Sequence, residues 1–296
     1  MSDFYRIKLL TRSSGHPEED RKFCFDNNLF AIGWPVDEDV KDIAQYKKSA
    51  EKKYCSGKEL SGNINSSFNN MKNIEKDDFV WTQKDARTYC LGKVNSKIIF
   101  KSDYIRRFGL TCSCEKWKEI NFDDVPGVVT SYFAGPGQVL VCCNSINENE
   151  DIKDYCNWLY NDKKTKIKIS NYKKLLHYDD LEDLLGLFLQ GSGYKGKRYY
   201  IHPSTNKLST KLIEYELRGE DGEKIGIQCK IGNSTVNSNN LKELTEKGYK
   251  IFVSTNSNRI CEGRNIENIT VEELWTWAKN HQKILPDRIK NYISLC

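Results

Sequence analysis

The spacing of hydrophobic positions changes near the middle of the chain. Before about residue 160, short β-branched and aromatic runs are separated by Gly, Asn and Asp, which is typical of strands joined by turns. The expected strands are FYRIKLL, LFAIGW, DFVWT, TYCLGKV, KIIFK and QVLVCC, with a polar helix over 37–54 between the second and third. Many short strands with one or two helices predict a small β-barrel. The Gly-rich segment 130–138 is expected to be a loop at the rim of a pocket.

After residue 160, helical and strand spacing alternate. A helix is expected over 179–190, because apolar residues fall on one helical face there (Leu181, Leu184, Leu185 and Phe188). A strand hairpin follows, then a helix over 239–248 and a strand over 250–255. Thr270 and Glu273 have the spacing of a capping box and predict a last helix, with Trp275 in the core. This order predicts an α/β layout.

A polar, charge-rich segment over 144–170 separates the two patterns. The sequence therefore predicts two domains, over residues 1–160 and 161–296. The fold class is α+β overall. It combines an N-terminal small β-barrel with helices and a C-terminal α/β domain with a central mixed sheet.

Composition agrees with folded domains, since 38% of the 296 residues are hydrophobic and 11% aromatic. The N-terminus has no basic start followed by a long apolar run, and the apolar runs are too short to span a bilayer. We therefore expect a cytoplasmic protein with no membrane partner. The eleven cysteines lack the ligand spacing of zinc sites, so buried reduced thiols are expected. No phosphate-binding loop of the Walker type is present, so no nucleotide cofactor is expected.

The net charge is +5, and the whole basic excess lies from Lys166 onward. A modest basic excess is compatible with a polyanionic partner, although many unrelated domains are as basic.

The hairpin YELRGEDGEKIGIQCK carries an unusual set of polar side chains. Residues two apart share a face of a strand, and the Asp-Gly pair marks the turn. Pairing the two arms puts Glu214, Glu216, Gln228 and Lys230 on one surface. Carboxylate and amide oxygens can hold Mg²⁺, and a lysine can stabilise charge on a phosphate, as phosphodiester hydrolysis requires. The alternative is the solvated polar face of an ordinary hairpin.

The hairpin resembles the motif of the PD-(D/E)XK nuclease superfamily, in which an acidic residue on one strand is followed by a short turn and by an acid or Gln, any residue and Lys on the next strand. The residues QCK are most similar to the Mrr-like branch of this superfamily. The resemblance covers roughly residues 170–296. It implies that Glu216 is the metal-binding acid, with Glu214 as the alternative. Gln228 would be the second ligand through its carbonyl oxygen, and Lys230 the catalytic lysine. The implied cofactor is Mg²⁺, with Mn²⁺ as a substitute.

These nucleases also use an acid on the preceding helix to hold metal or water. The resemblance assigns that role to Glu182, which stacks over the buried face of the helix predicted at 179–190. Asp180 and Asp183 are expected to face solvent or to act as favourable charges at the helix N-terminus.

The segments DDFVWT and CLGKV resemble PUA-like domains of the EVE type, over roughly residues 1–150. The resemblance implies an aromatic pocket that holds an extruded, modified base by stacking. The candidate walls are Trp34, Trp81, Tyr89, Tyr132 and Phe133. Lys84 and Arg87 are the candidate phosphate contacts. The alternative for both tryptophans is an ordinary place in the core.

Together the two resemblances imply a modification-dependent DNA endonuclease, similar to type IV restriction enzymes. It would flip a modified base into the N-terminal pocket and cut nearby with Mg²⁺. A homodimer is expected, at least on DNA, because cleavage of both strands needs two sites. Three alternatives remain: a non-catalytic reader of modified DNA or RNA, an RNA-directed nuclease and, more remotely, a subunit of a larger defence complex.

Overall fold

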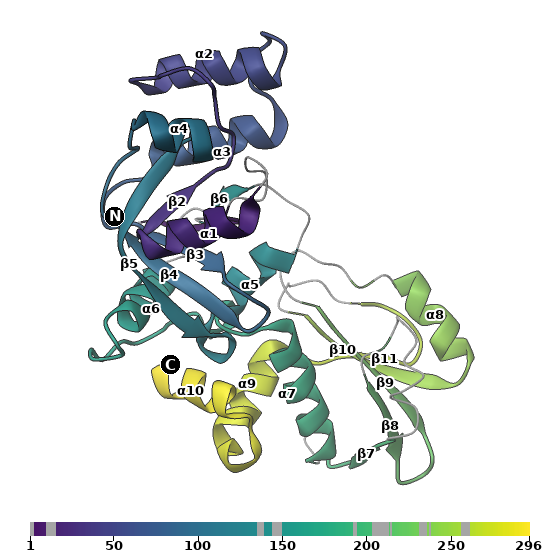
Figure 1. The fold of residues 1–296 in the computed structure, drawn as a ribbon. Coiled ribbons are helices and arrows are strands. Elements are labelled where there is room, and N and C mark those ends of the chain that lie inside the picture. Colours follow the sequence, from purple (N-terminus) through teal and green to yellow (C-terminus); the bar gives the residue numbers. More distant parts are fainter. Residues whose placement is uncertain are drawn as a thin grey trace. The chain divides into compact units, whose positions relative to one another are not determined.

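The computed structural model describes residues 3–9, 16–134, 139–143, 150–191, 194–202, 213, 215–230, 236, 238–255 and 261–296. These residues form a mixed α and β protein with ten α-helices and two mixed sheets (Figure 1). The chain divides into two compact units, Met1–Ser170 and Asn171–Cys296, whereas the sequence placed the change after residue 160.

The first unit contains a six-stranded sheet in the order β2-β5-β4-β3-β1-β6. All neighbours are antiparallel except β1 and β3, which are parallel. The long strand β5 pairs with β2 near its start and with β4 further along, and the sheet curls into a half-barrel (Figure 1). The strands are β1 (Phe4–Ile7), β2 (Leu29–Ala31), β3 (Phe79–Gln83), β4 (Thr88–Val94), β5 (Thr111–Asn121) and β6 (Leu140–Cys142).

Helices make up more of this unit than the one or two that the sequence predicted. They are α1 (Pro17–Asp26), α2 (Ile43–Tyr54), α3 (Gly62–Asn73), α4 (Ser102–Phe108), α5 (Gly127–Ala134) and α6 (Glu150–Tyr160). The predicted strand KIIFK is not a strand, β5 was not expected, and α5 occupies much of the predicted loop over 130–138. The polar helix α3 was missed because Asn and Ser dominate it, and Phe68 and Met71 are its only large buried side chains.

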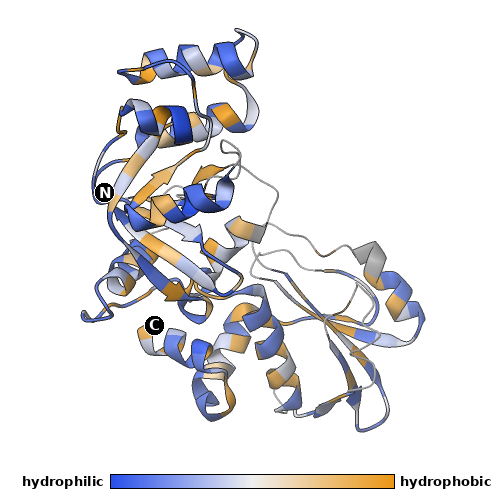
Figure 2. Ribbon diagram, in the orientation of Figure 1, coloured by the Kyte–Doolittle hydropathy of each residue, from blue (hydrophilic) through white to orange (hydrophobic). Residues whose placement is uncertain are grey.

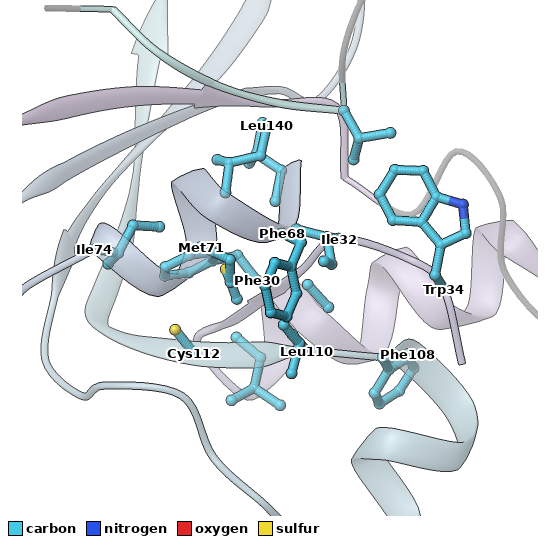
Figure 3. Packing of buried hydrophobic residues seen from close by; sticks show 14 of the residues in the cluster. Phe30, Ile32, Trp34, Phe68, Met71, Ile74, Phe108, Leu110, Cys112 and Leu140 are labelled. Atoms are coloured by element: carbon cyan, nitrogen blue, oxygen red, sulfur yellow. The ribbon is translucent and has the colours of Figure 1, made fainter. Parts of the chain in front are cut away.

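The two faces of this sheet have separate cores. Val80 and Trp81 are consecutive in β3 and point to opposite faces. Val80 belongs to a large cluster that also contains Phe30, Trp34 and Phe108 (Figure 3). Trp81 lies on the other face, where its indole N–H donates a hydrogen bond to Cys156 of α6 over 3.3 Å.

The second unit contains a five-stranded sheet in the order β11-β10-β9-β8-β7. Strands β7, β8 and β9 are antiparallel neighbours, whereas β9, β10 and β11 run parallel. Its elements are α7 (Tyr178–Gln190), β7 (Tyr199–Ile201), β8 (Tyr215–Gly219), β9 (Lys224–Lys230), α8 (Ser238–Glu246), β10 (Tyr249–Thr255), β11 (Ile266–Asn268), α9 (Val271–Asn280) and α10 (Asp287–Leu295). The predicted hairpin and the helix, strand and helix after it are all present.

Local sequence signals correctly predicted the buried face of α7 and the N-terminus of α9. The apolar stripe predicted for α7 is buried, and Figure 2 shows hydrophobic and hydrophilic residues alternating around that helix. The capping box at α9 is confirmed, since Thr270 and Glu273 exchange side chain to backbone hydrogen bonds, and Trp275 is buried as predicted. Among the helices of the described ranges, none has both the length and the apolar character that a membrane span requires.

Candidate functional site

The register of β8 and β9 decides which side chains of the hairpin share a face. Glu216 lies opposite Gly226, and Tyr215 lies opposite Ile227. Directly opposite residues point to the same side of a sheet, and residues two apart do so as well. Glu216, Gly226, Gln228 and Lys230 therefore share one face, and Tyr215 the other. Glu214, the alternative acid, lies outside the described residues.

The face that carries Glu216 packs beneath α8. A Cβ on Gly226 would lie 2.8 Å from Ile251 and 2.9 Å from Ile213, and both belong to a cluster with Leu241 of α8. Glu216 and Gln228 are consequently only 7% and 5% exposed. Strand alternation along LIEYELR predicts that Ile213 shares the face of Tyr215. That prediction is wrong, because β8 begins only at Tyr215 and Ile213 packs on the face of Gly226.

Two neighbours hold the carboxylate of Glu216. The hydroxyl of Tyr249, on β10, donates to Oε2 over 3.0 Å. Arg218 Nη2 lies 2.6 Å from Oε1 and forms an ion pair. Because Tyr249 lies level with Lys224 near the turn, the carboxylate points towards the turn end of the hairpin.

Gln228 and Lys230 lie further along β9, away from the turn. Each step of two residues advances about 7 Å, so the three side chains form a line along the face and do not meet at one point. In the parallel pairing with β10, Lys230 lies level with Thr255 where both strands end, and it is partly exposed. A phosphate group could therefore reach Lys230 from solvent more easily than it could reach Glu216.

The donor set of this face is sparse for a metal ion. Within the described ranges, no three or more His, Cys, Asp and Glu side chains lie close enough together to hold a metal. Mg²⁺ is commonly held by one or two carboxylates, with water and substrate phosphate filling the other positions. Glu216 and Gln228 fit that kind of site, although the Oε1 atom of Glu216 is in ion-pair contact with Arg218.

The helix acids are arranged differently from the prediction. Burial, together with the charges of Asp183 and Glu182, raises the pKa of Tyr215 to about 12. Helix α7, which carries Glu182, packs on the face of Tyr215, where Asp183, Gly186 and Leu187 line a cavity together with Tyr215 and Leu217. That face is opposite to the one that carries Glu216 and Gln228.

The sequence predicted that Asp180 and Asp183 face solvent or act as favourable charges at the helix N-terminus. Neither is exposed, but Asp180 does lie in the first turn of α7. Asp180 is fully buried, where it accepts a hydrogen bond from the backbone N–H of His177 and one of 2.7 Å from Arg288 of α10. Asp183 is partly buried and accepts a hydrogen bond of 3.3 Å from the hydroxyl of Tyr215. The pattern of α7 could not predict this burial, because Arg288 and Tyr215 are distant in the sequence.

Trp34 is a core residue and lies apart from the other four predicted pocket walls. Its backbone carbonyl accepts a hydrogen bond of 2.7 Å from Tyr46, and a Cβ on Gly109 would lie 2.8 Å from the same oxygen. Its ring belongs to the buried cluster that also contains Ile32 and Phe108 (Figure 3). The prediction that Trp34 lines a common aromatic pocket is therefore not supported by this packing.

Of the other four aromatic residues, Trp81 and Tyr89 point to the same face of the sheet, and Tyr89 contacts Phe133. Trp81 is fully buried, and Tyr89, nearly buried, packs edge-on against Phe133 at a centroid distance of 5.3 Å. Phe133 and Tyr132, both on α5, are partly exposed. Arg6, which the sequence analysis missed, lies level with Trp81, with its guanidinium 5.5 Å from the ring of Phe133. Burial lowers the pKa of Arg6. The lone arginine among apolar residues in FYRIKLL was the available signal.

The two predicted phosphate contacts lie in the β3–β4 turn, and both are exposed. Lys84 forms an ion pair with Glu119. Asp85 closes the turn by accepting hydrogen bonds from the backbone N–H groups of Arg87 and Thr88. In the part of the chain that the structure describes, Arg87 has no carboxylate within ion-pair distance, so it is the more available of the two cations.

We compared the chain with known protein families, curated proteins and solved structures, and none of the three comparisons found a match.

Proposed function

We propose that this protein is a Mg²⁺-dependent nuclease that acts on DNA carrying a modified base. The observation that carries the proposal is the hairpin register, which puts Glu216, Gln228 and Lys230 on one face. The surrounding order of helix α7, strands β7 to β9, helix α8 and strand β10 is the order on which the resemblance to PD-(D/E)XK nucleases rests.

Each residue has a distinct role in this proposal. Glu216 and Gln228 would hold the metal, which supplies an activated water and neutralises charge on the phosphate. Tyr249 fixes the orientation of the Glu216 carboxylate through its hydrogen bond. Arg218 forms an ion pair with the same carboxylate and must release it before a metal can bind there. Lys230, the last residue of β9 and partly exposed, stabilises negative charge on the phosphate.

The first unit would select the DNA. Tyr132 and Phe133 are partly exposed and offer rings for stacking an extruded base, with Tyr89 and Trp81 behind them. Arg6 offers hydrogen-bond donors beside Phe133. Arg87 would contact the backbone. Cutting both strands would need a second copy of the chain, so we expect a homodimer on DNA, in the cytoplasm.

One observation favours a second candidate, a non-catalytic reader of modified DNA or RNA. Arg218 and Tyr249 already occupy the carboxylate of Glu216, and Gln228 brings no negative charge to the site. Each feature weakens metal binding. A reader would keep the base pocket and use the second unit as a scaffold.

Cleavage assays with Mg²⁺ test the proposal on unmodified DNA and on DNA with cytosine or adenine modifications. Lys230→Ala removes the proposed catalytic lysine, and Lys224→Ala is its matched control on the exposed, turn end of the same strand. Loss of one charge-stabilising group lowers a rate by about 10²–10³-fold. We expect that loss for Lys230→Ala and wild-type rates for Lys224→Ala.

The same assay with Glu216→Gln and with Glu214→Gln identifies the metal-binding acid. Only the substitution of that residue should abolish cutting. RNA with matched modifications tests the RNA-directed alternative. Absence of cutting, together with tight binding to modified DNA that Lys230→Ala leaves unchanged, would reject the nuclease and support the reader.

A further inference from the structure

A cavity of about 420 Å³ lies in the second unit, on the face of the hairpin opposite to Glu216. Helix α7 lines it with Asp183, Gly186 and Leu187, and β8 lines it with Tyr215. The segment 284–286 forms another wall. Cavities of this size hold small organic molecules in other proteins. All of these residues belong to one compact unit, so the cavity is a feature of that unit alone.

Gly186 contributes free space to this cavity. It lies in the interior of α7, and a Cβ at this position would have no heavy atom within 4 Å. A glycine in a helix interior destabilises the helix by roughly 0.5–1 kcal/mol relative to alanine. Packing does not require the glycine here, since nothing fills the position of the missing side chain. The space is therefore available to a ligand.

The cavity is largely apolar, and its rim exposes large apolar side chains. Ile201 and Ile284 line it and are 41% and 54% exposed. Single exposed apolar residues are common, but two that border one cavity indicate a surface that a ligand covers. An occupant of this cavity should therefore have an apolar body.

One carboxyl group faces this apolar space. Asp183 accepts a hydrogen bond of 3.3 Å from Tyr215, also in the lining. Asp179 and Glu182 add further negative charge on the same helix. The charge of Arg288 acts on Asp183, but Arg288 is itself bound to Asp180. A positive charge on the occupant would therefore complement the cavity.

We propose that this cavity binds a small organic amine with an apolar ring or chain, whose ammonium group lies against Asp183. The apolar body fills the space beside Gly186 and Leu187 and is covered by Ile201 and Ile284. This ligand site is separate from the proposed nuclease face, because Tyr215 and Glu216 point to opposite sides of β8.

The test uses the full chain without nucleic acid or metal, so its result does not depend on the proposed nuclease activity. Three probes of matched shape are titrated by calorimetry and by NMR: 2-phenylethylamine, 2-phenylethanol and 3-phenylpropionate. A charge-assisted hydrogen bond should make the amine bind about tenfold more tightly than the alcohol. The carboxylate should bind most weakly.

Two substitutions separate the charge from the space. Asp183→Asn should lower the affinity of the amine to that of the alcohol and leave the alcohol unchanged. Gly186→Leu fills the cavity and should abolish binding of both, with circular dichroism as the check that it folds. Lys230→Ala, on the other face, should bind the amine like the wild type.

Equal affinities for amine and carboxylate would overturn the proposal, as would a folded Gly186→Leu that still binds the amine. Absence of amine binding to the wild-type chain would overturn it as well. If Gly186→Leu does not fold, the Asp183→Asn comparison alone decides whether the ammonium group lies against that carboxylate.

Discussion

Replacing Gly186 by alanine should stabilise the protein. The added Cβ meets no heavy atom within 4 Å, and the backbone there is helical, so no clash or strain opposes the change. Alanine restricts the unfolded chain and removes the entropic penalty of glycine in a helix. The free energy of unfolding of the second unit should rise by about 0.5–1 kcal/mol.

Gly222→Ala is the matched control, since it is the same chemical change in the same unit. Gly222 lies in the turn between β8 and β9, and a Cβ there would also have free space. It differs in its backbone, because its φ of +81° lies in the left-handed region. Alanine in that region costs roughly 1–2 kcal/mol. The two variants should therefore change stability in opposite directions.

The free energy of unfolding of both variants can be measured by urea unfolding, followed through hydrogen exchange of the amides in 178–190 and 215–230. These amides report on the second unit even if the two units unfold separately. A Gly186→Ala protein that is less stable than the wild type would refute the free space at this position. A neutral Gly222→Ala would refute the assignment of strain to its φ angle.

Three further outcomes follow from the packing. Arg288→Met should destabilise the second unit by about 3–5 kcal/mol in urea, because it leaves the buried carboxylate of Asp180 without its cation; a loss below about 1 kcal/mol would contradict this. Burial raises the folded-state pKa of Asp183, so the stability that this carboxyl contributes is complete below its ordinary pKa and is lost as the pH rises through the raised value. Asp183→Asn should therefore increase the free energy of unfolding at pH 7 but not at pH 3, and equal effects at both would contradict the shift. Trp81→Ala should lower the free energy of unfolding by about 3–5 kcal/mol in thermal or urea unfolding, because the ring is fully buried. Phe133→Ala should chiefly weaken binding to modified DNA. If Trp81→Ala weakened DNA binding and Phe133→Ala chiefly lowered stability, Trp81 would be the pocket wall.

Local patterns predicted the elements whose apolar residues are regularly spaced. Helix α7 has four apolar residues at helical spacing, and the β8–β9 hairpin combines strand alternation with an Asp-Gly turn. Helix α3 has neither feature. Its sequence, GNINSSFNNMKN, becomes helical through tertiary packing of Phe68 and Met71 against the core of the first unit.

The candidate site could be predicted only as far as strand alternation extends. Alternation put Glu216, Gln228 and Lys230 on one face, which the register reproduces. It could not show that Glu216 is held by Tyr249, because that contact comes from the pairing of β9 with β10. Nor could it separate Trp34 from Trp81, since the face each ring occupies depends on how the sheet curls.

The position of β1 has a consequence for biosynthesis. Tyr5 pairs with Val80 of β3 on one side and with Cys142 of β6 on the other, so this early strand ends up inside the sheet. At bacterial to eukaryotic elongation rates, on the order of ten seconds separate the synthesis of Tyr5 from that of Cys142. During that interval an apolar strand with open edges leaves the ribosome before its second neighbour exists. Chaperone binding to the nascent chain should therefore concentrate on this segment, and its release should coincide with the emergence of β6.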